Sequence, residues 1–230
     1  MRKLIGVAAI LILALSFTCK AIAQDDDAYK FEMGAAIGMS GYLGDANTSN
    51  LFKYPQPAGA AFFRYLINQR WAAKGTLTIA GLKGNSAYMT NVFPGGETYK
   101  FHSNIYDLDG RIEYNFFNYG IGKAYRKLSR WTPYIGVGLG VIISTVNHKS
   151  YAAVNLPMNV GIKYKLQPCI NLAIDWTMTK VFGDKVDGTL LDDPYLIKSS
   201  FIKNTDWYST VMVSISYEFG VRCKSCFYVD

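Results

Sequence analysis

The chain has 230 residues, of which 50% are hydrophobic, 15% aromatic and only 18% charged. Its formal net charge is +7. Three of the basic residues (Arg2, Lys3 and Lys20) lie in a predicted leader, so the remaining excess is too small to favour a nucleic-acid-binding protein. Few charges, many aromatic residues and 21 glycines are more typical of a β-barrel in lipid than of a water-soluble sandwich.

Residues 1–23 have the pattern of a signal peptide. Arg2 and Lys3 precede an apolar core, and residues 21–23 form an Ala-Ile-Ala cleavage site. The core is shorter than the about 20 residues that a transmembrane helix needs. We therefore expect an exported chain that consists of a single barrel domain, residues 24–219, and a tail, residues 220–230.

Eight segments of the mature chain alternate between bulky apolar residues and polar or small ones, which is the period of a β-strand with two different faces. In chain order they cover about residues 29–41, 58–67, 71–79, 104–116, 135–143, 154–164, 170–178 and 207–219. The last segment exceeds the roughly 9–11 residues that a membrane-spanning strand requires. The pattern predicts an all-β fold, namely an eight-stranded antiparallel transmembrane (outer-membrane) β-barrel with a packed polar lumen.

The connections between these segments alternate in length. Those at about 42–57, 82–103 and 182–205 are long, whereas those at 68–70 and 167–169 are short. In bacterial outer-membrane barrels the long loops face outside and the short turns face the periplasm, which would place the tail in the periplasm. The connection at 117–132 departs from the rule because it is long and basic.

Most charged residues of the strands lie at the polar positions of the alternation. An eight-stranded barrel has room inside only for side chains, and an unpaired buried charge is strongly destabilising. We predict a lumen charge network formed by Glu32, Arg64, Lys74, Asp107, Asp109, Arg111, Glu113, Lys163, Asp175 and Glu218. In it, Arg111 and Lys74 should pair with Asp107, Asp109 or Glu113. The alternative is a small polar channel.

Alternation alone does not say which face points inward. A lipocalin-like soluble barrel would turn the apolar face inside, but the low charge fraction and the strand length favour lipid outside. Aromatic residues near the strand ends would then form interfacial girdles. The candidates are Trp71, Trp131, Tyr134, Trp176 and Trp207.

The sequence offers no clear catalytic chemistry. His102 and Ser103 are adjacent on a predicted strand and would point to opposite faces. The aspartates between residues 184 and 193 do not have the spacing of an EF-hand loop. Gly136, Gly138 and Gly140 lie within a strand, with no helix after them, so they are no dinucleotide-binding motif. We expect no enzyme activity, no catalytic residue, no cofactor and no metal site.

Unusual residues lie on the side of the short turns: three cysteines and a basic loop. Removal of the leader leaves three cysteines, namely Cys169, Cys223 and Cys226. An odd number of cysteines in an oxidising compartment has three possible explanations: an internal disulfide, a bridge to a partner, or redox or metal chemistry.

The basic loop at 117–132 forms either a docking or membrane-surface element or a solvated turn. Its basic residues, at roughly helical spacing, are Lys123, Arg126, Lys127 and Arg130.

Several stretches, in their order along the chain, resemble the PorG-like outer-membrane proteins of the type IX secretion system. They are Glu32–Gly34, Ser40–Asn47, Arg64–Tyr65, Asn68–Ala72, Glu113–Phe117, Thr132–Tyr134, Pro157–Tyr164, Phe182–Asp187 and the cysteine-bearing tail. The resemblance covers nearly all of the mature chain, although Asn159 stands where a glycine is expected.

This resemblance implies an outer-membrane subunit, without enzyme activity, that contacts the periplasmic ring lipoprotein and its partner subunit. The basic loop and the tail cysteines would supply the contact: Lys123, Arg126, Lys127, Arg130, Cys223 and Cys226. Partners would thus be outer-membrane lipid and the ring, with no nucleic acid and no small-molecule substrate. The alternatives are a passive small barrel or adhesin, or an enzyme that modifies lipid A.

Overall fold

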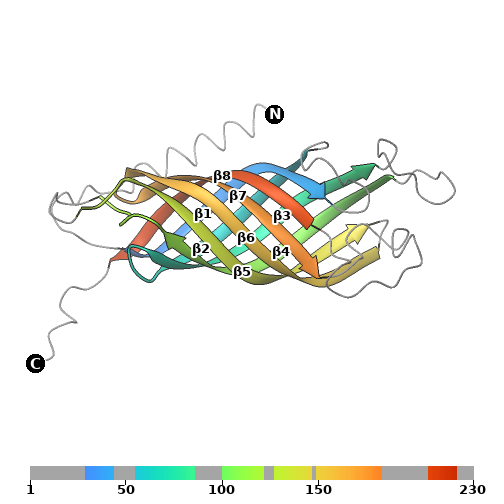
Figure 1. Ribbon diagram of the computed structural model, residues 1–230, viewed down its shortest axis with the longest axis horizontal. Helices are drawn as coiled ribbons and strands as arrows, with labels where there is room; N and C mark the ends of the chain where they lie inside the picture. The colour runs from blue at the N-terminus through green and yellow to red at the C-terminus, as the bar shows by residue number, and fades with distance from the viewer. Residues whose placement is uncertain are drawn as a thin grey trace, which may run out of the picture.

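The computed structural model describes residues 29–43, 55–85, 100–121, 127–146, 149–182 and 207–221. Eight antiparallel strands close into a barrel in chain order, with the first strand paired to the last (Figure 1). The strands are β1 (Tyr29–Leu43), β2 (Gln56–Leu66), β3 (Trp71–Asn85), β4 (Lys100–Asn115), β5 (Trp131–Val146), β6 (Lys149–Gln167), β7 (Ile170–Phe182) and β8 (Trp207–Val221). The predicted eight-stranded antiparallel barrel is confirmed. No helix within these residues is long and apolar enough to cross a membrane.

The two ends of the barrel differ in their connections. We call the end with residues 67–70, 116–130 and 168–169, where β1 begins and β8 ends, the short-turn rim; it lies on the left in Figure 1. The opposite end, the long-loop rim, carries the connections 44–55, 86–99, 147–148 and 183–206. β8 continues beyond Phe219 to Val221 because Val221 pairs with Tyr29. The predicted signal peptide and the tail from residue 222 lie outside the described residues.

The bulky apolar side chains of the alternation face outward. Leu139 and Ile37, for example, are 63% and 75% exposed. Most charged side chains in the middle of the strands face the lumen and are buried, whereas Lys30 and Lys83, near strand ends, are exposed. A barrel with this arrangement is stable only where lipid covers its outer wall. The chain therefore forms a transmembrane β-barrel, and the lipocalin-like alternative is wrong.

Groups of aromatic rings, which together we call the aromatic belt, lie on the outer wall near the short-turn rim. Ring centroids lie 4.8 Å apart between Trp71 and Tyr114 and 5.0 Å apart between Phe117 and Trp131. A further aromatic group on β1, β2 and β8 consists of Phe31, Phe63, Tyr65 and Phe219. Such belts mark the height at which a barrel meets the lipid headgroups.

Tyr134 does not belong to this belt, so its assignment to a girdle is wrong. Its side chain is fully buried in the lumen, and Lys163 Nζ lies 4.1 Å from the centre of its ring. Successive residues of a strand point to opposite faces. Because Ile135 faces outward, Tyr134 has to face inward.

Two inward-facing glycines allow neighbouring strands to approach closely. A Cβ atom added at Gly138 would lie 2.0 Å from the carbonyl oxygen of Gly110, and one at Gly38 would lie 1.9 Å from that of Val211. Gly110 itself is exposed, and a Cβ added there would have no atom within 4 Å. Gly138 is thus required by the packing of β4 against β5, whereas Gly110 is not.

This difference predicts opposite tolerance to alanine. G138A should destabilise the barrel by about 1–3 kcal/mol, because its methyl group has to displace backbone. G110A, on the neighbouring strand, should unfold like the wild type. Urea unfolding in detergent, followed by tryptophan fluorescence, measures both. Equal midpoints for the two variants would contradict this account of the wall.

Candidate functional site

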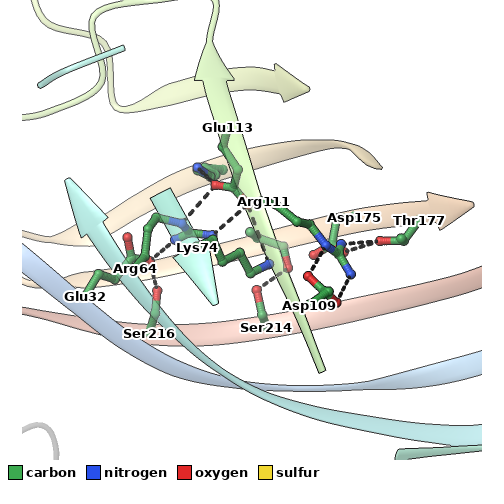
Figure 2. A network of polar contacts seen from close by, with 12 residues as sticks. Glu32, Arg64, Lys74, Asp109, Arg111, Glu113, Asp175, Thr177, Ser214 and Ser216 are labelled. Atoms are coloured by element: carbon green, nitrogen blue, oxygen red, sulfur yellow. Dashed lines mark hydrogen bonds and ion pairs between the residues drawn. The ribbon is translucent and has the colours of Figure 1, made fainter. Parts of the chain in front are cut away.

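The lumen contains a buried carboxylate, Glu113 on β4, that is surrounded by cations from other strands (Figure 2). Arg64 Nε and Lys163 Nζ lie 2.9 and 2.7 Å from its Oε2 atom, and Lys74 Nζ lies 3.6 Å from Oε1. Arg64 also forms an ion pair with Glu32. Together these contacts connect β1, β2, β3, β4 and β6 across the interior.

A second group lies beside the first and is centred on Arg111 (Figure 2). Its Nε and Nη2 atoms donate to the two carboxylate oxygens of Asp109 at 2.6 and 2.7 Å. Its Nη1 atom donates to Thr177 Oγ1 at 3.1 Å, and Thr177 Oγ1 in turn donates to Asp175 at 3.4 Å. This bidentate pair is the strongest form of an arginine–carboxylate contact. It links β4 to β7.

Tyr119, from the 116–130 loop, reaches the lumen at the short-turn rim. Its hydroxyl donates to Asn171 Oδ1 at 2.9 Å, and Lys165 Nζ lies 5.0 Å from the centre of its ring. Beneath it, Lys165 Nζ and Asn171 Nδ2 both donate to Glu218 Oε1, at 2.6 and 2.8 Å. Burial, followed by the charges of Glu32 and Glu218, raises the pKa of the Tyr119 phenol above its ordinary value. Tyr119 therefore remains a neutral donor.

The long-loop end of the lumen is apolar instead of charged. Buried side chains from seven of the strands pack into one cluster there: Ala36, Ala58, Ala80, Leu82, Ile105, Ile142, Val181, Tyr208 and Met212. At its base, Asp107 accepts hydrogen bonds from Asn155 Nδ2 at 2.6 Å and from the hydroxyl of Tyr208. The lumen is thus packed along its length, with a charged part and an apolar part.

All ten residues of the predicted lumen set are buried. The exposed fraction of each residue lies between 0% and 7%, and the set consists of Glu32, Arg64, Lys74, Asp107, Asp109, Arg111, Glu113, Lys163, Asp175 and Glu218. Arg111 pairs with Asp109, and Lys74 with Glu113. Lys165 was missed although it shares the parity of Lys163, because the predicted strand ended at residue 164.

The described parts of the basic loop, residues 116–121 and 127–130, are joined by an isolated parallel β-bridge between Tyr119 and Ser129. The amide of Gly120 donates to the carbonyl of Ser129 at 3.0 Å, and the amide of Ser129 donates to that of Asn118 at 2.8 Å. Lys127 has a positive φ of 49°, so the expected helical spacing does not correspond to a helix at this residue. Lys127 and Arg130 are exposed. Lys123 and Arg126 lie outside the described residues.

Cys169 lies in the turn between β6 and β7 and is buried, with 3% exposure. It is disulfide-bonded, and its carbonyl oxygen accepts a hydrogen bond from the amide of Glu218 at 2.8 Å. The other cysteines of the chain, Cys19, Cys223 and Cys226, lie outside the described residues. Among the residues that are described, no group of three or more His, Cys, Asp and Glu side chains is arranged to hold a metal ion.

The sequence was compared with known families and proteins. A family model described as "Domain of unknown function (DUF6089)" matches residues 8–230. The chain belongs to the DUF6089 family. No curated protein matches this sequence.

The DUF6089 barrel is similar to solved structures of small barrels. Neisserial surface protein A aligns over 82% of this chain and 97% of its own, with 13% identity and a TM-score of 0.51. The attachment invasion locus protein Ail of Yersinia pestis (12% identity, 83% and 99% coverage, TM-score 0.46) and OprG of Pseudomonas aeruginosa (13%, 84% and 97%, 0.45) also match. At this level of identity the likeness shows the fold.

Removal of the central carboxylate tests the lumen network. E113Q leaves Arg64, Lys74 and Lys163 buried without their shared anion, so the barrel should lose about 3–5 kcal/mol of stability. T76V is the matched control, because Thr76 is also buried, at 5% exposure, and its hydroxyl has no hydrogen-bond partner in the structure. Unfolding in urea measures both variants. An E113Q barrel as stable as T76V would rule out the network as a structural element.

Proposed function

We propose that this DUF6089 protein is a non-enzymatic outer-membrane subunit of a type IX secretion machine, and that its short-turn rim contacts the periplasmic ring of that machine. The observation that carries the proposal is the packed lumen. Because paired charges and an apolar cluster occupy the interior that the described residues enclose, we assign no substrate to the lumen. What the protein does then depends on its outer surfaces.

The proposed location and orientation rest on general features of such barrels. A transmembrane barrel with a predicted signal peptide is typical of the bacterial outer membrane, where short turns face the periplasm. The short-turn rim is also the end where the basic loop, the disulfide-bonded Cys169 and the belt of aromatic rings lie. The resemblance to PorG-like proteins supplies the machine itself.

Arg130, one of the cations of the basic loop, is held at its backbone. The carbonyl oxygen of Arg130 accepts a hydrogen bond from the amide of Lys165 at 2.7 Å, which ties the end of the loop to β6. Lys127 and Arg130 are exposed, and Lys123 and Arg126 belong to the same loop. Such a group of like charges favours association with an acidic partner surface.

The cysteines suggest a second contact on the same rim. Cys169 is disulfide-bonded, and Cys223 and Cys226 stand in the tail that follows β8. We infer that one tail cysteine bridges Cys169 and that the other is available to a periplasmic partner. The alternatives of an internal bridge alone, or of redox or metal chemistry in the tail, remain outcomes of the experiment below.

An enzyme acting on lipid A is not favoured by the geometry of β4. Ser103 is fully buried in the lumen, and His102, the next residue of the strand, belongs to the opposite face. A passive barrel or adhesin is the second candidate. It would use the long-loop rim and would tolerate changes at the short-turn rim.

A pulldown from outer membranes tests the proposal. Reversal of Lys123, Arg126, Lys127 and Arg130 to glutamate should abolish co-purification of the ring lipoprotein, because the attraction becomes repulsion. Reversal of Lys83, Lys185, Lys198 and Lys203, which belong to the long-loop rim or its loops, is the matched control and should leave co-purification unchanged. Both variants should assemble normally, as judged by heat-modifiable mobility on gels.

The same pulldown, run without reductant, tests the sulfur contact. A high-mass band should appear for the wild type and disappear for the variant that carries both C223S and C226S.

If the variant with Lys123, Arg126, Lys127 and Arg130 reversed co-purifies as well as the wild type, the docking role of the loop is wrong. If the wild type runs as a monomer with all thiols accounted for within the chain, the covalent contact is excluded.

A further inference from the structure

Arg70 is an exposed arginine in the turn between β2 and β3, and its backbone is held in place. The side-chain oxygen of Asn68 accepts hydrogen bonds from the amides of Arg70 and Trp71, both at 2.8 Å. The amides of Ile67 and Asn68 donate to the carbonyl of Trp71 at 3.0 and 3.1 Å. The turn therefore presents Arg70 from a defined position on the short-turn rim.

The guanidinium group of Arg70 is also oriented, although it is exposed. Its Nε atom donates to Asn118 Oδ1 at 2.9 Å and its Nη1 atom donates to the hydroxyl of Tyr114 at 3.3 Å. Both acceptors are neutral, and the ion pairs among the described residues do not include Arg70. These two contacts leave N–H groups on both terminal nitrogens for another acceptor.

The surroundings of Arg70 place it at the height of the lipid headgroups. Trp71, the next residue, is 44% exposed on the outer wall, and its ring packs against that of Tyr114. Tyr114 packs in turn against Phe116, with ring centroids 5.6 Å apart. Because the aromatic belt marks the membrane interface, the charge of Arg70 lies where phospholipid phosphates are found.

We propose that Arg70, held by Asn118 and Tyr114, binds the phosphate of a phospholipid in the leaflet at the short-turn rim. A planar guanidinium with its remaining N–H groups on two adjacent nitrogens matches two oxygens of a phosphate, which a lysine ammonium does not. The flanking rings of Trp71 and Tyr114 then lie beside the upper part of the acyl chains. This site is independent of the proposed secretion partner.

Native mass spectrometry of the delipidated barrel, titrated with phosphatidylglycerol in detergent, tests the site. R70Q should weaken binding of the first lipid at least about tenfold, because a charge-assisted pair is lost. R70K should bind with intermediate affinity, since it keeps the charge but not the two-pronged geometry. K83Q, which removes one exposed charge from the other end of β3, should bind like the wild type.

Two further titrations test whether the site recognises the phosphate of a whole phospholipid, and not the acyl chains alone or a free phosphate ion. Diacylglycerol, which has no phosphate, should bind the wild type and R70Q equally weakly, and inorganic phosphate should not displace the lipid at equal concentration. The proposal is overturned if R70Q binds phosphatidylglycerol like the wild type or if K83Q loses as much affinity. It is also overturned if inorganic phosphate competes equally, because the site would then recognise a free anion. Heat-modifiable mobility confirms that each variant is folded.

Discussion

Compensation of buried charge is the constraint on which the rest of this barrel depends. Eight strands enclose a space that side chains fill, and the alternation of the strands directs acids and bases into it. Glu113 meets three cations, and Arg111 holds Asp109 with two hydrogen bonds. A charge in such a place is tolerated only when its partner is present and well placed. The network therefore fixes which strands face each other across the lumen.

This interior leaves the surface as the place of function. The outer wall is apolar along every strand, so lipid covers it, and the two rims are the parts that differ from a generic barrel. At the short-turn rim the 116–130 loop places Tyr119 over the charged end of the lumen, while Asn118 from the same loop orients Arg70. The same loop thus contacts the lumen through Tyr119 and the outer part of the rim through Asn118.

The sequence predicts the strands and most of the inward charges because a period of two is a local property. It does not predict the apolar end of the lumen: Leu82, Ile105 and Ile142 stand at inward positions and look like breaks in the alternation. Parity turns these residues inward, but whether they pack together depends on where all eight strands place them along the axis. That placement is set by register, which no single segment contains.

Other features were missed for different reasons. Lys165 follows the predicted end of its strand, and strand ends are determined by the neighbouring strand, here through its ion pair with Glu218. The inward position of Tyr119 depends on the fold of a loop with no periodicity. Tyr134, by contrast, could have been placed correctly from parity alone, since its neighbour Ile135 belongs to the apolar face.

The side chains of the barrel themselves fill the lumen and hold it closed. Reconstitution of the purified barrel into planar lipid bilayers, with recording of single-channel current, tests this most directly. With a filled lumen, the barrel should insert into the bilayer without steady conductance. A steady, large conductance from the wild-type protein would contradict it, because ions would then have a continuous water-filled path through the space that the network and the apolar cluster occupy.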